Sequence, residues 1–356
     1  MMATITTVIP TYRRPALLRR AICSVLEQTY RHIIVRVFDN ASGDETEAVV
    51  ARIAAADPRV IYHRHPANIG AFENFLFGMR AVDTPLFSFL SDDDVLFPNF
   101  YETAVAALES QPDALLFAGS TLEFAEDGAL LYVPLAYWPR EGTFEPPEGA
   151  LRMLGNRHPT WTGIVFRREA IDRVGVLDRE VGPASDLDYA MRVAARFPML
   201  VSFAPCAAYV SHPGSNSVNE TVAVVPGYEK MIRTLAGDER IDAAARAELR
   251  RRLLAQVRGK LLEISVKSLV RGDAEGSRAA ALMLRDRYHA RVSGSALLAL
   301  RAACVALPPL HRALIWAEGV RLRRRARASR ERLQAQQRNG AADLEAYSRY
   351  LETPAN

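Results

Sequence analysis

The chain has 356 residues, of which 49% are hydrophobic and 24% are charged. This composition is typical of a folded protein with a sizeable core, and it excludes disorder or a coiled coil for most of the length. The net charge is only +4, but residues 246–332 hold 21 Lys and Arg against 7 Asp and Glu, so an acidic body precedes a basic C-terminal region.

The three cysteines, Cys23, Cys206 and Cys304, have no paired spacing. This argues against a disulfide framework and a cysteine-based zinc site, and it fits a reducing compartment. The N-terminal stretch MMATITTVIPTYRR reaches a proline and two arginines before an apolar export signal could form. We therefore expect a cytoplasmic protein, either free or peripheral on the inner face of the plasma membrane.

Strand and helix patterns alternate over residues 3–90. Strands are expected at 3–10, 32–39, 59–65 and 86–90, and helices at 15–28, 42–56 and 71–82. This alternation predicts βαβ units on a parallel sheet, in which ligands bind at the carboxyl ends of the strands.

Polar residues follow the expected strands at those ends. Thr11 and Tyr12 follow the first strand, Asp39 ends the second, and 92–94, three consecutive aspartates, follow the fourth. Adjacent carboxylates repel one another, and a divalent cation with oxygen ligands would relieve that repulsion. The alternative is an acidic turn that caps the next element.

Beyond residue 98 the pattern becomes mixed. Helices are expected at 97–110 and 185–197, strands at 114–125, 129–136, 162–167 and from 199, and mostly helix from about 226. We expect a catalytic domain at 1–225, with a nucleotide-sugar half at 1–98 and an acceptor half at 99–225. A basic helical region at 226–335 and a tail at 336–356 would follow.

Six sequence blocks, in this order and spacing, resemble the family 2 glycosyltransferases over about residues 3–218. They are VIPTYRRPALLRRAICSVLEQTY, DNAS, NIGAFENF, FLSDDDVLFP, VGVLD with SDLDYAMRVA, and SHPGSNS. The resemblance implies an inverting, metal-dependent enzyme with a GT-A fold, an α/β nucleotide-binding sandwich with a mostly parallel central sheet, followed here by a helical C-terminal region. Ser91 and Ser185 depart from the family's pattern, because each stands where the family usually has an acid.

The resemblance also implies a metal and diphosphate site. Asp93 takes the family's ligand position for Mn²⁺ or Mg²⁺, and Asp94 and His212 are further candidates for that cation. Asp92 and Asp93 would also contact the nucleotide sugar. For His212 the alternative is a loop histidine bonded to local backbone.

The resemblance places the base pocket of the nucleotide at Thr11, Tyr12, Asp39 and Asn68. Gly70 would let the backbone approach the nucleotide closely, or Asn68 and Gly70 simply form a turn. Arg13 and Arg14 could neutralise phosphate, but paired arginines before a helix are common on surfaces, so neither is assigned to the site.

Asp186 is the candidate general base, since it retains the second acid of the family's pair. Its alternative is an ordinary charge at a helix N-terminus, and Asp188 is interpreted as structural or supporting. Trp161 could stack on an acceptor sugar or pack under the sheet, and His158 has the same two interpretations.

The segment 293–330 has short apolar runs beside an arginine cluster. No run reaches the ~20 residues that a spanning helix needs. It could lie on an anionic membrane, or pack on the body or on a second subunit as a homodimer. No nucleic-acid-binding module is recognised.

The sequence thus predicts an inverting glycosyltransferase with a UDP-, dTDP- or GDP-sugar donor and a glycan or lipid-linked acceptor. Such an enzyme would serve the synthesis of cell-envelope polysaccharide, lipid-linked glycan or another glycoconjugate. The alternative is a non-catalytic relative that binds a sugar nucleotide or a glycan, which the serines at 91 and 185 would explain. A nucleotidyltransferase is disfavoured because VIPTYRRP contains no glycine.

Overall fold

The computed structural model describes residues 2–211, 220–336, 347 and 349–351. The chain divides into two compact units. Unit 1 comprises 1–179, 186–211 and 329–356, and unit 2 comprises 180–185 and 212–328. The ranges expected from sequence, 1–225, 226–335 and 336–356, follow different bounds and stay a prediction about domain organisation.

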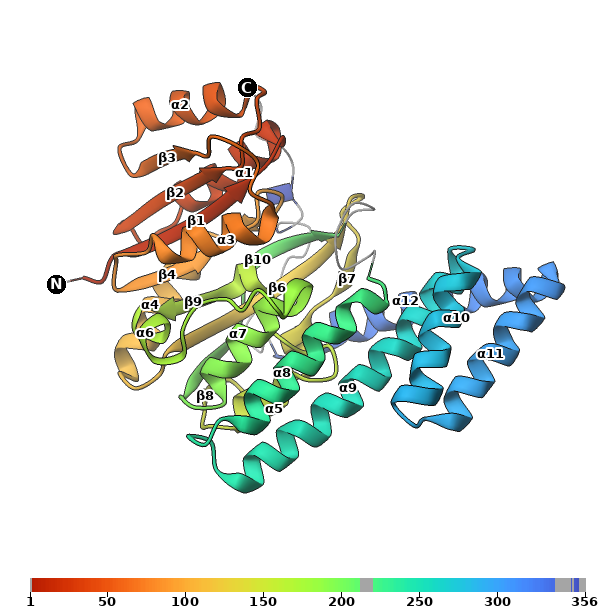
Figure 1. The fold of residues 1–356 in the computed structure, drawn as a ribbon. Coiled ribbons are helices and arrows are strands. Elements are labelled where there is room, and N and C mark those ends of the chain that lie inside the picture. Colours follow the sequence, from red (N-terminus) through yellow and green to blue (C-terminus); the bar gives the residue numbers. More distant parts are fainter. Residues whose placement is uncertain (1, 212–219, 337–346, 348, 352–356) are drawn as a thin grey trace. The chain divides into compact units, whose positions relative to one another are not determined.

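Unit 1 begins with the alternating pattern that the sequence predicts. The elements are β1 (Ile5–Thr11), α1 (Pro15–Leu26), β2 (Ile33–Asp39), α2 (Thr46–Ala56), β3 (Val60–Arg64), α3 (Ala71–Arg80) and β4 (Leu86–Phe89). Pro15 opens α1, where its fixed φ and missing N–H suit the first helical turn. The four strands are parallel and lie in the order β3-β2-β1-β4 (Figure 1).

This order creates a topological switch point between β1 and β4. The chain builds outward from β1 to β2 and β3, and then returns to the other side of β1 with β4. The connections therefore diverge at the carboxyl ends of β1 and β4, which leaves a crevice that commonly binds ligands. Thr11 and Asp39 are paired in register at this edge.

Alternation along β1 distributes its side chains between the two sheet faces. Ile5 and Ile9 belong to a buried cluster with apolar residues of α1 and α4 (Phe100–Ser110). Val8 points to the opposite face, where α3 packs so closely that a Cβ on Gly78 would lie 2.4 Å from Val8 Cγ1. The sheet is thus covered on both faces.

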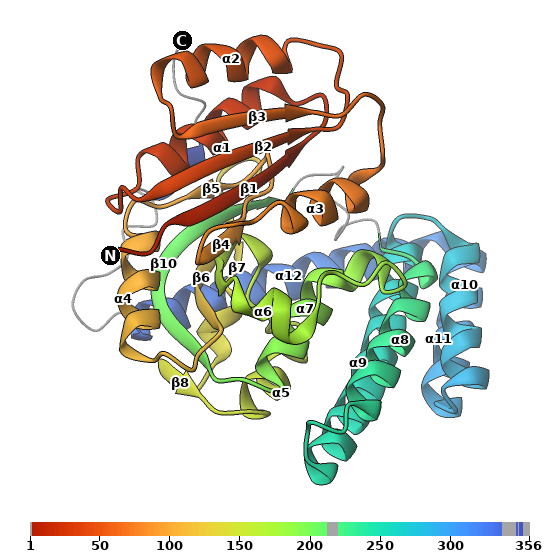
Figure 2. The ribbon, with the colours of Figure 1, turned by 60° about the vertical axis from the view of Figure 1, so that its left-hand side comes forward.

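The second half of unit 1 has a mixed sheet. Its elements are β5 (Val95–Leu96), α4, β6 (Leu116–Ala125), β7 (Leu130–Tyr132), η1 (Pro134–Tyr137), β8 (Gly142–Phe144), α5 (Glu148–Met153), η2 (Trp161–Gly163), β9 (Ile164–Arg167), α6 (Glu169–Val174), α7 (Ser185–Ala194) and β10 (Met199–Ser211). β9 pairs antiparallel with β4 and β6. The long strand β10, labelled in Figure 2, runs parallel to β6. Parallel pairing thus occurs among β1–β4 and between β6 and β10, and β9 joins the two groups by antiparallel pairing.

The C-terminal end of the chain completes the core of unit 1. Leu333 is fully buried in a cluster that includes Phe97 and Phe124, and Tyr347 and Leu351 pack against the same cluster. The ring centroids of Phe97 and Tyr347 are 4.5 Å apart. The described residues of the expected tail thus contribute to packing.

Unit 2 is helical. Besides η3 (Gly182–Ala184) and η4 (Val222–Val224), it contains α8 (Val225–Gly237), α9 (Ala243–Val270), α10 (Ala274–Leu282), the π-helical turn η5 (Met283–Arg287), α11 (Arg291–Ala306) and α12 (Pro308–Gln336) up to residue 328. Asp242 caps α9 by accepting a bond from the Ala245 N–H at 2.9 Å. Across the described ranges, no helix combines the length and apolar content needed to cross a bilayer.

Candidate active site

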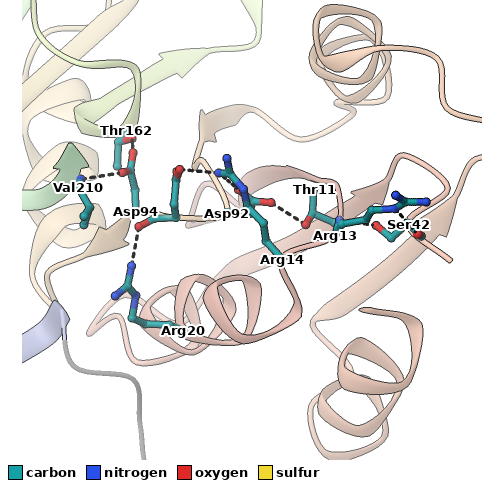
Figure 3. A network of polar contacts seen from close by, with 10 residues as sticks. Thr11, Arg13, Arg14, Arg20, Ser42, Asp92, Asp94, Thr162 and Val210 are labelled. Carbon is teal, nitrogen blue, oxygen red and sulfur yellow. Dashed lines mark hydrogen bonds and ion pairs between the residues drawn. The ribbon is translucent and has the colours of Figure 1, made fainter. Parts of the chain in front are cut away.

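The crevice edge brings together Thr11, from the end of β1, and Asp92, which follows β4. The Thr11 hydroxyl donates to Asp92 Oδ2 at 2.7 Å, and both residues are almost fully buried (Figure 3). This contact confirms that the carboxyl ends of the two strands converge at the switch point, and it fixes the first of the three aspartates.

The second aspartate, Asp93, is held by Arg14 from the start of α1. Arg14 Nη1 lies 2.6 Å from Asp93 Oδ2 and 3.2 Å from Asp92 Oδ1. The Arg14 side chain is 38% exposed and that of Asp93 15%. The arginine therefore offsets the repulsion between the adjacent carboxylates and leaves Asp93 the more accessible of the pair.

The third aspartate, Asp94, points into the protein. Its Oδ2 accepts a hydrogen bond from the Thr162 hydroxyl at 2.5 Å, and its Oδ1 accepts one from the Val210 N–H at 3.2 Å (Figure 3). The residue is fully buried. In this structure the carboxylate ties η2 and β10 to the end of β4 and presents no exposed oxygen to a ligand, which departs from its expected role as a cation ligand.

Arg20 supports the aspartates from behind. Its Nη2 donates to the Asp93 carbonyl at 2.6 Å, and its Nη1 donates to the Leu351 carbonyl at 2.5 Å. Burial lowers the pKa of Arg20, while the nearby Asp94 and Asp93 oppose that effect. Arg20 of α1 thus links the backbone at Asp93 to the backbone at Leu351 through hydrogen bonds.

Burial disfavours the charged forms of Asp92 and Asp94. It raises the pKa of Asp92 to about 6, with a further increase from the neighbouring Asp93, while Thr11 and Arg14 oppose the shift. Burial also raises the pKa of Asp94 well above its ordinary value. A nearby positive charge therefore stabilises the ionised carboxylates of residues 92–94, and Arg14 supplies one by pairing with Asp92 and Asp93.

The side chain of Asp39 lies at the end of β2, as predicted, and is already hydrogen-bonded. Its Oδ1 accepts bonds from the N–H and hydroxyl of Ser42, at 2.9 and 2.5 Å. Its Oδ2 accepts a bond from the Tyr62 hydroxyl at 2.6 Å, which leaves room for one more donor at this oxygen. The predicted contact with a base N–H stays a prediction.

Tyr12 and Asn68 also lie at this edge of the sheet. The Tyr12 ring is 39% exposed, and the Arg13 guanidinium lies 5.0 Å from its centroid. Asn68 Oδ1 accepts bonds from Asn40 Nδ2 at 3.0 Å and from the Gly70 N–H at 2.9 Å. Gly70 has a φ of +88°, so the turn before α3 requires its conformational freedom.

Asp186 and Asp188 occupy the first turn of α7 in very different surroundings. Asp186 is half-buried, and its Oδ1 accepts a bond from the Leu187 N–H at 2.7 Å. Asp188 is almost fully buried and forms an ion pair with Arg192 at 2.7 Å. Asp188 thus has the structural role that the sequence suggests, while the role of Asp186 as a base stays a prediction.

Trp161 is half-buried in an aromatic cluster. Its ring stacks on Phe89 with a centroid distance of 4.5 Å, and Phe166 and Tyr189 pack against it at 5.6 and 6.2 Å. One face of the indole is therefore used for packing next to β4. Binding of an acceptor sugar by the remaining surface of Trp161 stays a prediction.

His212 lies outside the described residues. Over residues 2–211, 220–336, 347 and 349–351, no three His, Cys, Asp or Glu side chains gather closely enough to hold a metal ion. A surface hollow of about 570 Å³, lined by Ile69, Glu73, Leu76, Phe77, Arg80 and Arg179, contains none of the predicted site residues.

Arg14 is the main residue of the site that sequence reasoning left out. The signal was its position just after the first strand, three residues beyond Thr11, but a surface role explained the same position. Ser42, Tyr62 and Thr162 were also missed. Tyr62 and Thr162 each reach an aspartate that lies far away in sequence, while Ser42 bonds to Asp39 only three positions before it.

The site thus consists of buried carboxylates and an arginine at the switch point of an α/β sheet. Residues 6–175 match the family model described as glycosyl transferase family 2. The chain therefore carries a family 2 glycosyltransferase domain.

Curated relatives match over short regions. An uncharacterized glycosyltransferase of Rickettsia felis is 29% identical over 128 residues, which are 35% of this chain and 21% of the relative. The GalNAc(5)-diNAcBac-PP-undecaprenol beta-1,3-glucosyltransferase of Campylobacter jejuni is 30% identical over 96 residues, 27% of this chain and 31% of that protein. The chain spans well under half the length of these relatives.

Solved structures share the fold across most of the chain. TarS of S. aureus in complex with UDP-GlcNAc has a TM-score of 0.61 and 14% identity, covering 94% of this chain and 92% of that one. The mannosyltransferase PcManGT of Pyrobaculum calidifontis, in complex with GDP-Man and Mn²⁺, has a TM-score of 0.51 and 17% identity, covering 92% and 86%. These likenesses show the GT-A fold of this chain.

Proposed function

We propose that this protein transfers a sugar from a nucleotide-diphospho-sugar to an acceptor hydroxyl, with inversion at the anomeric carbon. The observation that carries the proposal is the convergence of Thr11, Arg14, Asp92 and Asp93 at the switch point of a family 2 domain. Ligands in open α/β sheets bind at such a point.

The base pocket would be formed by Thr11, Tyr12, Asp39 and Asn68, which lie at the ends of β1 and β2 and in the turn before α3. The solved structures with this fold were obtained with UDP-GlcNAc or GDP-Man. UDP- and GDP-sugars are therefore the first donors to test here, with dTDP-sugars next.

A divalent cation suits the chemistry of this donor set. Asp93 supplies a hard carboxylate oxygen that is less buried than those of Asp92 and Asp94, and diphosphate oxygens would complete the coordination. When bound, Mn²⁺ or Mg²⁺ stabilises the charge that develops on the leaving diphosphate. We assign the cation to Asp93, with His212 as a further candidate, and give Asp94 a structural role.

Asp186 would act as the general base. A proton passes from the acceptor hydroxyl to its carboxylate as the hydroxyl oxygen bonds to the anomeric carbon and the nucleotide diphosphate departs. Asp186 Oδ2 would take the proton, since Oδ1 already accepts the Leu187 N–H. The acceptor would be a glycan or a lipid-linked glycan positioned with the help of Trp161.

The free cysteines Cys23, Cys206 and Cys304 support placing this enzyme in the reducing cytoplasm. Synthesis of cell-envelope polysaccharide, lipid-linked glycan or another glycoconjugate there agrees with a glycan acceptor. A homodimer is a further option for the assembly.

The proposal is tested by thermal unfolding with UDP, GDP, dTDP and CMP, each with and without Mn²⁺, followed by a transfer assay with the matching sugar nucleotides. A ligand that binds only the folded protein raises the melting temperature. A shift for one nucleotide that requires Mn²⁺, together with turnover, supports the enzyme. Binding without turnover of any donor would favour the non-catalytic relative, in line with Ser91 and Ser185.

A further inference from the structure

The corner between α11 and α12, in unit 2, is apolar and exposed. Residues 305–310, with the sequence VALPPL, are all exposed to solvent. Val305 and Leu307 are 59% and 57% exposed, and Trp316 in the third turn of α12 is 69% exposed. Ile315 beside it is 43% exposed. Contiguous apolar side chains of this size on a surface mark an interaction site.

The charges beside this corner are almost all positive. Residues 305–328 contain six arginines and one glutamate. The glutamate, Glu318, is paired with Arg321 at 2.6 Å. Arg312, Arg323 and Arg324 are exposed and form no ion pair with any residue that the structure describes.

The apolar and basic residues share one face of α12. Arg312, Trp316 and Arg323 are separated by four and seven positions, which places them along one side of a helix. The Trp316 indole thus stands between two unpaired guanidinium groups. An exposed tryptophan beside arginines suits contact with a membrane surface, where the ring lies at headgroup depth and the arginines bind lipid phosphates.

We propose that the α11–α12 corner docks on an anionic phospholipid surface. Its partner is the lipid surface and not a second copy of the same corner, because a symmetric contact would bring the unpaired arginines of the two copies together. Within residues 305–328, Glu318 is the one acid that could offset that repulsion, and it is already paired. The inference goes beyond the proposed sugar transfer, since membrane docking needs neither nucleotide nor cation.

The test is co-sedimentation of the full chain with vesicles of phosphatidylcholine alone and of phosphatidylcholine mixed with phosphatidylglycerol. We expect binding to the anionic vesicles only, weakened by salt, with a blue shift of the Trp316 fluorescence. The double variant Trp316→Ala, Arg323→Gln should bind at least about tenfold more weakly, because loss of one arginine alone weakens attachment about fivefold.

A matched control is the double variant Arg291→Gln, Val292→Ala. Both residues are exposed, with Val292 at 86%, but they lie at the opposite end of α11, about 24 Å of helix away. This variant should bind as the parent does. The proposal is overturned if the parent does not bind anionic vesicles, or if both double variants lose binding equally. It is also overturned if the parent protein is a dimer, the double variant Trp316→Ala, Arg323→Gln is a monomer, and neither binds vesicles.

Discussion

Arg14 Nη1 lies 2.6 Å from Oδ2 of Asp93, the residue to which we assign a divalent cation. The same nitrogen lies 3.2 Å from Asp92 Oδ1. One guanidinium thus supplies the positive charge that these carboxylates need without a cation. Because Arg14 and a cation would compete for the same Asp93 carboxylate, their binding to that carboxylate should be antagonistic.

Replacing Arg14 by glutamine tests this antagonism. Without cation, we expect Arg14→Gln to lower the free energy of unfolding by about 1 kcal/mol, because the two carboxylates lose their counter-charge. Addition of Mn²⁺ should then raise the melting temperature of the variant more than that of the parent. Thermal unfolding over a series of Mn²⁺ concentrations, without nucleotide, measures both effects.

Arg52→Gln serves as the control. Arg52 is exposed on α2, and its side chain donates only to the Ala48 carbonyl in the described structure. Its Mn²⁺ response should equal that of the parent. An equal Mn²⁺ response of Arg14→Gln would show that Arg14 and the cation do not compete for the Asp93 carboxylate.

The raised pKa of Asp92 predicts a pH dependence of stability without cation. The folded state holds the Asp92 proton up to a pKa of about 6, against 3.8 for an unperturbed aspartate, so protonation favours folding. The contribution of this group is therefore complete below pH 3.8 and is lost as the pH rises through about 6. The loss in free energy of unfolding should be of the order of 3 kcal/mol.

Urea unfolding at a series of pH values from about 4 to 7 measures this slope. In Asp92→Asn the fall should become shallower, although the buried Asp94 keeps a slope of the same sign. Asp83→Asn, at an exposed residue paired with Arg36, should leave the profile unchanged. A parent stability that rises between pH 4 and 6 would contradict the assignment.

The positions of the aspartates were predictable from sequence, but their individual roles were not. Alternating apolar runs predict β1–β4 and place Asp92, Asp93 and Asp94 at a strand end, because that periodicity is local. Whether a carboxylate faces the crevice or the core depends on distant residues. Asp94 is buried by Thr162 and Val210, which lie 68 and 116 positions further along the chain.

The local sequence pattern also did not predict that the C-terminal residues contribute to the core of unit 1. Residues 321–336 are mainly polar and arginine-rich, which is typical of a solvated helix. Leu333 is nevertheless fully buried, mostly against aromatic and aliphatic residues that precede it by about 200 positions or more. The stretch holds two leucines, Leu322 and Leu333, which define no periodicity by themselves, so only the folded chain identifies Leu333 as core.

Asp186 and its neighbour Asp188 form a matched pair for the catalytic assignment. Asp186→Asn should keep the melting temperature and nucleotide binding and reduce transfer about 10²- to 10⁴-fold, because only the acceptor of the proton is lost. Initial rates at saturating donor, together with nucleotide titrations, measure this. Transfer at the parent rate would refute Asp186 as the base.

Asp188→Asn should show the opposite pattern. It leaves the nearly buried Arg192 without its carboxylate, so the free energy of unfolding should fall by about 2–4 kcal/mol. Nucleotide binding by the fraction that stays folded should be unchanged. A fully stable Asp188→Asn protein without transfer activity would move the catalytic role from Asp186 to Asp188.

Leu322 and Leu333 on α12 test whether the end of that helix belongs to the core of unit 1. Leu333 is fully buried, so Leu333→Ala should lower the free energy of unfolding by about 2–4 kcal/mol through lost burial and a cavity. Leu322 is 45% exposed, so Leu322→Ala should change the free energy of unfolding by less than about 0.5 kcal/mol. Urea unfolding followed by the fluorescence of Trp138 and Trp161, both in unit 1, measures the two changes. Equal small effects would mean that the end of α12 is detached from this core in solution.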